Sequence, residues 1–303
     1  MRNAILYVST VLIWGSTWLA IEYQVGQASV FASVFYRFAI AAVLMWAYCL
    51  CFKVNMRFSL KGHTFILLLA LFNFSLNYVL IYQSQVYLTS AMTCIVFSTM
   101  LVMNIVNTKL FFGDTIAPKV YAGAALGLLG LVVLFWNDLK FNDSGAFYGL
   151  AFGLGAALVA SIGNMVSVRN SRANMNLLAV NAWGMLYGTL ALALMIVFTG
   201  ADFSASWQTE YILSLLYLAV FGTVIAFATY YALLNDMGPE KASYAIVLFP
   251  AVAVLLSSLF EDFTWSSNTF LGFTLVLVGN AVILTPIDKI KLWACRLSSS
   301  TVS

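Results

Sequence analysis

The stretch NLLAVNAWGMLYGTLALALMIVF, from residue 176 to residue 198, contains no charged side chain. A helix needs on the order of 20 apolar residues to cross the hydrocarbon core of a lipid bilayer. Because lipid offers no hydrogen-bond partners to backbone amides and carbonyls, a stretch of this kind has to form a helix. The stretch therefore predicts a membrane-spanning helix, and the rest of the chain repeats the pattern.

The whole chain has the composition of a membrane protein. Of its 303 residues, 63% are hydrophobic and only 8% are charged, whereas a soluble domain is about half apolar and about a quarter charged. The net charge of +3 is too small to indicate binding to nucleic acid. The expected partner of most of the surface is therefore the lipid bilayer.

Nine other apolar stretches match the first in length and composition. They do not alternate polar and apolar residues, as the strands of a membrane β-barrel do. The sequence therefore predicts an all-α membrane protein with ten transmembrane helices. We place them near residues 3–22, 30–52, 63–83, 89–111, 118–136, 145–168, 176–198, 210–234, 241–260 and 268–287.

The basic residues support this count. If the N-terminus lies inside the cell, twelve of the 14 lysines and arginines fall on the inner side, Lys140 lies outside and Arg37 lies within a span. In membrane proteins the cytoplasmic loops carry the excess of basic residues. We therefore expect a multi-pass protein of the cell (inner) membrane with both termini in the cytoplasm. The twelve inner residues are Arg2, Lys53, Arg57, Lys61, Lys109, Lys119, Arg169, Arg172, Lys241, Lys289, Lys291 and Arg296.

The chain also contains an internal repeat. Gly123 and Gly130 in the fifth stretch are matched 149 residues later by Gly272 and Gly279 in the tenth. Each half then holds five helices, an odd number, so the two halves have opposite orientations in the membrane. Inverted repeats of this kind are the basis of alternating access in many transporters. The expected units are a first repeat at residues 1–138, a second repeat at 145–288 and a cytoplasmic tail at 289–303.

Several short motifs occur in a defined order across the two halves. They are Trp14-Gly15-Ser16-Thr17-Trp18 in the first stretch, Tyr36-Arg37-Phe38 in the second, Phe97-Ser98 and Asn104 in the fourth, and Phe249-Pro250 in the ninth. With these motifs the chain resembles the EamA family of the drug/metabolite transporter superfamily, over roughly residues 3–287. The resemblance implies a ten-helix fold around a central cavity and export of amino acids, nucleobases or related metabolites.

Polar residues inside the spans are costly, so their positions indicate where a polar interior lies. Several recur at helical spacing and are expected to converge on a pocket for a small amphipathic solute. The alternative is that they hydrogen-bond between helices and hold the bundle together. The candidates for substrate binding in this group are Asn73 and Asn77 in the third span, Asn104 in the fourth, Ser161 and Asn164 in the sixth, and Tyr230 in the eighth.

Arg37 is the one full charge well inside a span. A buried guanidinium requires a partner or a water-filled cavity. We expect Arg37 to face the cavity, where it binds a carboxylate of the substrate or pairs with Glu22. The alternative is that its long side chain reaches the outer headgroups.

Three further residues complete the candidate site. Trp14 and Ser16 lie in the middle of the first span, and both are expected to contact substrate. An indole at this depth either stacks on a flat solute or packs in the core. Pro250 should free the carbonyl of Ile246 in the ninth span, which predicts either a hinge or a packing kink.

Other function classes lack their signatures. There is no G-x-x-x-x-G-K-[ST] loop for an ATP-driven pump, and a single histidine argues against a catalytic metal. We expect no catalytic residue, no bound metal and no cofactor. The sequence therefore predicts a secondary transporter that exports a small metabolite, an amino acid or a similar amphipathic solute, by alternating access. The alternatives are an intramembrane lipid-modifying enzyme and a passive channel.

The coupling of transport and the oligomeric state are less constrained. Proton antiport usually requires an ionisable group within the membrane, and the carboxylates of this chain lie at or near the helix ends. This distribution favours uniport or exchange over proton antiport. The glycine pairs in the spans are expected to pack the chain's own helices, which is compatible with a monomer.

Overall fold

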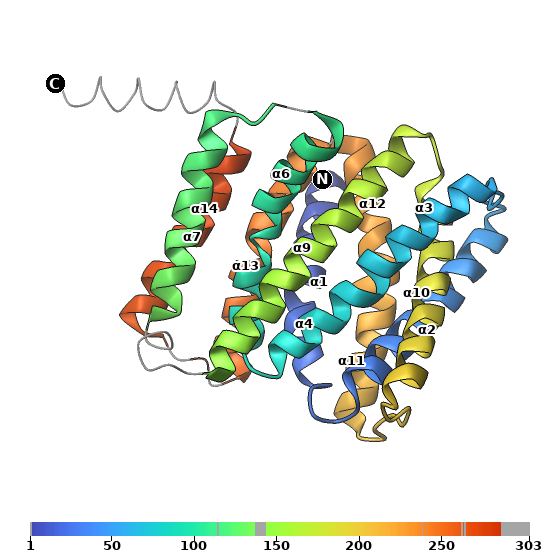
Figure 1. Cartoon of the computed structure of the whole chain (residues 1–303), viewed down its shortest axis with the longest axis horizontal. Helices are drawn as coiled ribbons and strands as arrows, with labels where there is room; N and C mark the ends of the chain where they lie inside the picture. The colour runs from blue at the N-terminus through green and yellow to red at the C-terminus, as the bar shows by residue number, and fades with distance from the viewer. Residues whose placement is uncertain are drawn as a thin grey trace.

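The computed structural model describes residues 2–113, 115–136, 144–237, 239–261, 263 and 265–285. Lys140 and the expected tail at 289–303 lie outside this part of the chain. Every regular element of the described part is a helix, and the helices form one bundle (Figure 1). They are α1 (Arg2–Glu22), α2 (Val30–Cys51), α3 (Leu60–Leu71), η1 (Phe72–Leu76), α4 (Asn77–Gln85), α5 (Ser90–Phe97), α6 (Met100–Phe112), α7 (Pro118–Leu134), α9 (Ser144–Arg172), α10 (Leu177–Thr199), α11 (Thr209–Ala219), η2 (Val220–Ile225), α12 (Ala226–Met237), α13 (Pro239–Phe260) and α14 (Ser267–Leu284).

The lengths and apolar composition of the helices are those of a polytopic membrane protein. Within the described residues, eight helical segments are long and apolar enough to cross a membrane. Two further apolar helices are shorter, at Pro118–Leu134 and Ala245–Phe260. They correspond to the fifth and ninth of the ten expected spans. The fold class predicted from the sequence, an all-α membrane protein, is therefore confirmed.

Two of the spans contain a π-helical segment. In η1, the Ser75 hydroxyl donates to the carbonyl of Ala70 at 3.1 Å, and in η2 the Thr223 hydroxyl donates to the carbonyl of Leu218 at 2.8 Å. Each hydroxyl thus reaches a carbonyl five residues earlier, at the point where the wider π turn displaces the usual bonding. Such insertions in α-helices are often found at functional sites.

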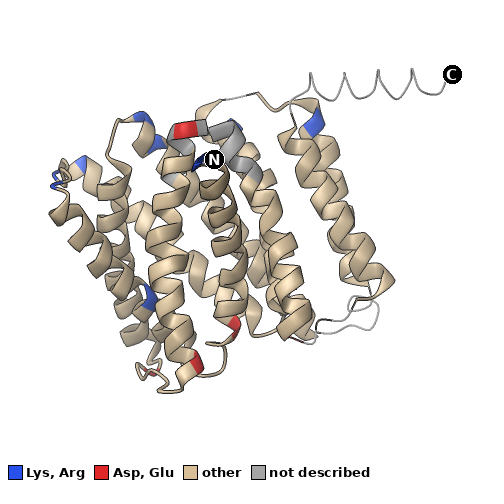
Figure 2. Ribbon diagram, turned by 180° about the vertical axis from the view of Figure 1, so that it is seen from behind, with Lys and Arg blue, Asp and Glu red and all other residues tan. Residues whose placement is uncertain are grey.

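The two ends of the bundle differ in charge. Basic side chains gather at the end where the chain begins (Figure 2). There Arg2, at the start of α1, forms an ion pair of 3.3 Å with Asp236, near the end of α12. Glu22 and Glu261 lie at the other end of the bundle, where α1 and α13 end. We call the end with Arg2 the basic end and the end with Glu22 the far end.

Helices α7 and α14 pack together along one edge of the bundle (Figure 1). A Cβ atom added to Gly123 would lie 2.6 Å from the carbonyl oxygen of Gly279, and one added to Gly130 would lie 2.7 Å from that of Gly272. The pairing runs in opposite directions along the two helices, so they are antiparallel. The glycines of the repeat therefore let two backbones touch directly.

This contact generates a prediction for Gly130→Ala. The added methyl group has no room against the backbone of α14, and overpacking of this kind typically costs about 1–3 kcal/mol. The free energy of unfolding, measured by denaturant titration in mixed micelles, should fall by that amount.

Gly127→Ala is the matched control, because a Cβ atom there meets nothing within 4 Å. It should leave stability unchanged or raise it slightly, since alanine is the better helix former. Equal destabilisation by both substitutions would contradict the close contact of α7 with α14.

Candidate functional site

A cavity of about 240 Å³ lies inside the bundle and is lined from both halves of the chain. It is smaller than the roughly 300–1,000 Å³ of most drug-sized ligand pockets, which indicates a small solute. Its lining comprises Trp14, Thr17, Trp18 and Ile21 of α1; Arg37 of α2; Asn77, Tyr78 and Ile81 of α4; Cys94 and Phe97 of α5; Ser98, which follows α5; Met100 of α6; Asn164 of α9; Phe227 and Tyr230 of α12; and Ile246, Phe249 and Pro250 of α13.

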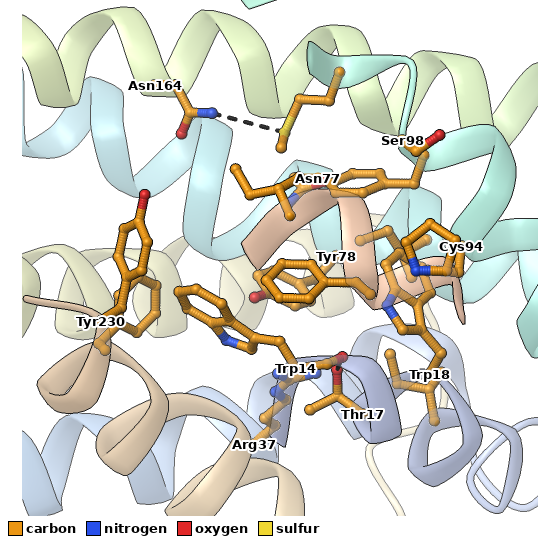
Figure 3. A pocket seen from close by; sticks show the side chains of 18 residues that line it. Trp14, Thr17, Trp18, Arg37, Asn77, Tyr78, Cys94, Ser98, Asn164 and Tyr230 are labelled. Atoms are coloured by element: carbon orange, nitrogen blue, oxygen red, sulfur yellow. Dashed lines mark hydrogen bonds between the residues drawn. The ribbon is translucent and has the colours of Figure 1, made fainter. Parts of the chain in front are cut away.

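Aromatic rings form much of the cavity wall (Figure 3). The ring of Trp14 lies 5.1 Å from that of Tyr230, 5.6 Å from that of Phe249 and 5.7 Å from that of Phe227, centroid to centroid. These are ordinary spacings for edge-to-face aromatic contacts. Trp14 therefore packs in an aromatic cluster and at the same time borders the cavity, and its stacking on a solute stays a prediction.

Arg37 lies in the cavity lining and does not reach the surface. Its side chain is 1% exposed. Its Nε donates to the hydroxyl of Thr223 in η2 at 3.4 Å, and its Cζ atom lies 4.5 Å from the ring centroid of Tyr78. Among the described residues no carboxylate pairs with it, and Glu22 is not its partner. The expected location in the cavity is thus observed, whereas the headgroup and Glu22 alternatives are not.

Two asparagines present amide groups to the cavity. Asn77 follows η1 directly, is 6% exposed, and its Oδ1 has no hydrogen-bond partner. Asn164 accepts a bond from Asn73 at 3.2 Å and donates to Asn104 at 3.3 Å. Figure 3 also shows its contact with the sulfur of Met100, at 3.6 Å. Asn73 and Asn104 therefore lie behind the lining and hold Asn164 in place.

The structure places two of the candidate hydroxyls outside the lining. Ser16 Oγ lies 2.6 Å from the hydroxyl of Tyr217 and donates to the carbonyl of Leu12 at 2.6 Å. Ser161 accepts a hydrogen bond from Asn107 at 2.9 Å, in the contact of α6 with α9. In this conformation both serve helix packing, the alternative that the sequence left open.

Tyr230 and Pro250 both belong to the cavity lining. Pro250 lies inside α13, directly after Phe249 in the sequence. The free carbonyl expected one turn earlier belongs to Ile246, which also lines the cavity. A hinge at this point stays a prediction.

Sequence reasoning missed part of the lining because it searched for polar residues. Trp18 and Ile21 follow Trp14 at intervals of four and three residues, which places all three on one face of α1. Tyr78 follows Asn77 and stacks under the Arg37 guanidinium. The helical spacing of the tryptophans was the available signal, but in an apolar span it does not separate a cavity wall from ordinary core.

The cavity is closed toward the far end. There the Tyr82 hydroxyl donates to Gln24 Oε1 at 2.8 Å, and Gln85 Nε2 donates to the carbonyl of Trp18 at 3.2 Å. Gln24 and Gln85 are buried together with Ile21. Lining residues nearer the basic end stay half-buried instead: Met100, Asn164, Tyr230 and Phe249. Burial of the side chains is therefore asymmetric between the two ends of the cavity.

No described group of three or more histidine, cysteine, aspartate or glutamate side chains is placed to hold a metal ion. Cys94 is the thiol in the cavity wall. The groups that can act on a solute in this site are therefore one cation, two amides, a few hydroxyls and aromatic faces, which bind and orient.

Known proteins share both sequence and fold with this chain. It is similar to a protein named "Uncharacterized transporter YoaV" of Bacillus subtilis, with 26% identity over 275 residues that cover 90% of this chain and 93% of the relative. Protein PagO of Salmonella typhimurium is 22% identical over 297 residues, covering 98% and 97%. The "Uncharacterized inner membrane transporter YedA" of Escherichia coli is 26% identical over 289 residues, covering 92% and 88%.

One solved crystal structure superposes on the described fold with a TM-score of 0.67 at 18% sequence identity, covering 93% of this chain and 96% of the other. The model of the EamA-like transporter family matches the sequence twice, at residues 1–136 and 147–285. Together the two matches cover nearly the whole length. The resemblance found in the sequence motifs is thereby confirmed, and the chain belongs to the EamA-like transporter family.

Proposed function

We propose that this protein is a secondary transporter that exports a small amphipathic metabolite, an amino acid or a similar solute, by alternating access. The observation that carries the proposal is the cavity between the two family-matched halves, closed at one end by hydrogen bonds and lined by half-buried side chains toward the other. A single enclosed site reached from one side at a time is what alternating access requires.

Ten transmembrane helices in two inverted repeats account best for the fold. Helix α7, with 17 residues, reaches about 26 Å at 1.5 Å per residue, close to the roughly 30 Å hydrocarbon core. A mismatch of this size is absorbed by local thinning of the bilayer or by flanking side chains that extend to the headgroups. The antiparallel pair of α7 and α14, and the π segments η1 and η2 in the third and eighth spans, support a two-fold relation between the halves.

The charge distribution supports a cytoplasmic basic end. Arg2, Lys61, Lys109 and Arg172 lie at or near helix ends on this side, and basic residues mark the cytoplasmic face of membrane proteins. With this orientation the described conformation faces the cytoplasm, from which an exporter loads its solute. The closure by Gln24 and Tyr82 then separates the cavity from the cell exterior.

The primary test is transport by the purified protein in proteoliposomes. A thermal-shift screen of a metabolite panel identifies ligands, since a solute that binds the folded state raises its apparent stability. Such a ligand should then show saturable counterflow. Flux that does not saturate would indicate a channel, and chemical conversion of the ligand during incubation would indicate an enzyme.

Trp14→Ala should weaken transport of that solute. The substitution removes an aromatic wall worth roughly 0.5–1.5 kcal/mol in ring contacts, so the KM for counterflow should rise about three- to tenfold. Trp207→Ala is the control, because Trp207 is 89% exposed and does not line the cavity. Equal KM values for the two variants would contradict the assignment of the site.

Accessibility of introduced thiols tests the orientation of the cavity. We would replace the native cysteines (Cys49, Cys51, Cys94 and Cys295) and add either Asn164→Cys or Gln24→Cys. A membrane-impermeant thiol reagent should modify position 164 in inside-out vesicles, because this side chain faces the half-open part of the cavity. Position 24 should resist the reagent added to intact cells, because Gln24 is 1% exposed.

Trp207→Cys serves as the positive control for labelling from outside. Labelling of position 164 only from the outside would show the opposite orientation.

A further inference from the structure

The chemistry of the cavity is dominated by one charge, the guanidinium of Arg37. The groups around it are neutral: the hydroxyl of Thr223, the rings of Tyr78 and Phe38, and the hydroxyl of Tyr82. No ion pair with a described carboxylate balances the charge. Since a buried charge without a partner is strongly disfavoured, the site lacks a negative group.

The geometry shows where that negative group belongs. Nη1 of Arg37 is buried and has no hydrogen-bond partner, although Arg37 lines the cavity. In Figure 3 its side chain extends toward Trp14 and Thr17, which line the cavity space. A carboxylate in that space would meet a free N–H donor of a guanidinium, the side chain best suited to carboxylates.

The same lining offers little to a positive charge. The described lining residues include no aspartate or glutamate. The free acceptor is the neutral Oδ1 of Asn77, which is buried and unpartnered. An ammonium group would find this amide oxygen, a few neutral hydroxyls and aromatic faces, while the Arg37 charge acts against it. A cation is therefore disfavoured, and a zwitterion gains less than an anion does.

The rest of the solute meets apolar walls. Trp14, Phe227 and Phe249 form a connected group of rings on the side of the cavity toward the basic end. Planar or apolar bodies pack well against such rings. The arrangement thus orders the solute, with its charged end at Arg37, toward the closed far end, and its body toward the half-open side.

We propose that the cavity selects organic monoanions: solutes with one carboxylate, no balancing positive charge and a flat apolar body, with the carboxylate held by Arg37. The inference rests on the proposed function, because it assigns a substrate class to the same cavity. It narrows the amphipathic solutes considered above to those whose net charge is negative.

Four probes with the same phenyl body test the charge rule. They are 3-phenylpropionate (anion), phenylalanine (zwitterion), 3-phenylpropionamide (neutral) and 2-phenylethylamine (cation). Titration calorimetry on the purified full-length protein should show the tightest binding for 3-phenylpropionate, at least tenfold tighter than the amide. Phenylalanine should fall between these two, and the amine should bind most weakly. Equal affinity for acid and amide, or no binding of the acid, would overturn the proposal.

Variants of Arg37 separate binding from folding. Arg37→Met should weaken binding of 3-phenylpropionate at least tenfold and leave that of the amide unchanged, whereas Arg37→Lys should keep part of the preference because it keeps the charge. The melting temperature of ligand-free Arg37→Met should equal or exceed that of the wild type, since an unbalanced buried charge is removed. A large fall in melting temperature with an unchanged preference for the acid would show that Arg37 is structural.

The two proposals fail differently in these measurements. If the protein transports a neutral or cationic solute from the metabolite panel, and Trp14→Ala impairs this transport, then the monoanion rule is wrong and the transporter stands. If 3-phenylpropionate binds as predicted but no solute shows counterflow, then the site is correctly assigned and transport is not its function.

Discussion

A lipid bilayer gives polar groups no hydrogen-bond partners, and this constraint shapes every level of the structure. It forces the backbone into helices and turns polar side chains toward one another. Ser161 and Asn73 satisfy their neighbours on other helices in this way. Among the buried atoms left without partners, Arg37 Nη1 and Asn77 Oδ1 belong to residues that line the cavity.

The sequence predicts the helical class and most of the spans because hydrophobic length is a strong signal in a membrane protein. It also places Arg37, Trp14, Asn77 and Asn164 in one interior, and the structure finds them lining one cavity. The sequence does not reveal the π segments η1 and η2. Their geometry depends on local packing and on hydrogen bonds such as those of the Ser75 and Thr223 hydroxyls. Nor does it distinguish Asn73, which supports Asn164 from behind, from Asn77, which lines the cavity. The two asparagines are of the same residue type and lie four residues apart, at helical spacing.

The two ends of the cavity connect the fold to its proposed use. At the far end, neutral hydrogen bonds from Tyr82 and Gln85 close the bundle, and bonds of this kind can exchange for water when the helices part. Along one edge, the glycine contacts between α7 and α14 press two backbones together and leave no room for side chains. The first kind of contact suits a gate, and the second suits a fixed frame against which a gate moves.

Distances across both ends of the bundle test this account most directly. Spin labels at Ala4→Cys and Ser171→Cys report on the basic end, and labels at Tyr23→Cys and Tyr148→Cys report on the far end; all four positions are exposed. Pulsed dipolar spectroscopy with a transported solute should show two populations at each end. When solute shifts the basic-end distance toward the shorter value, the far-end distance should shift toward the longer one. A single distance at each end, unchanged by a transported solute, would contradict alternating access.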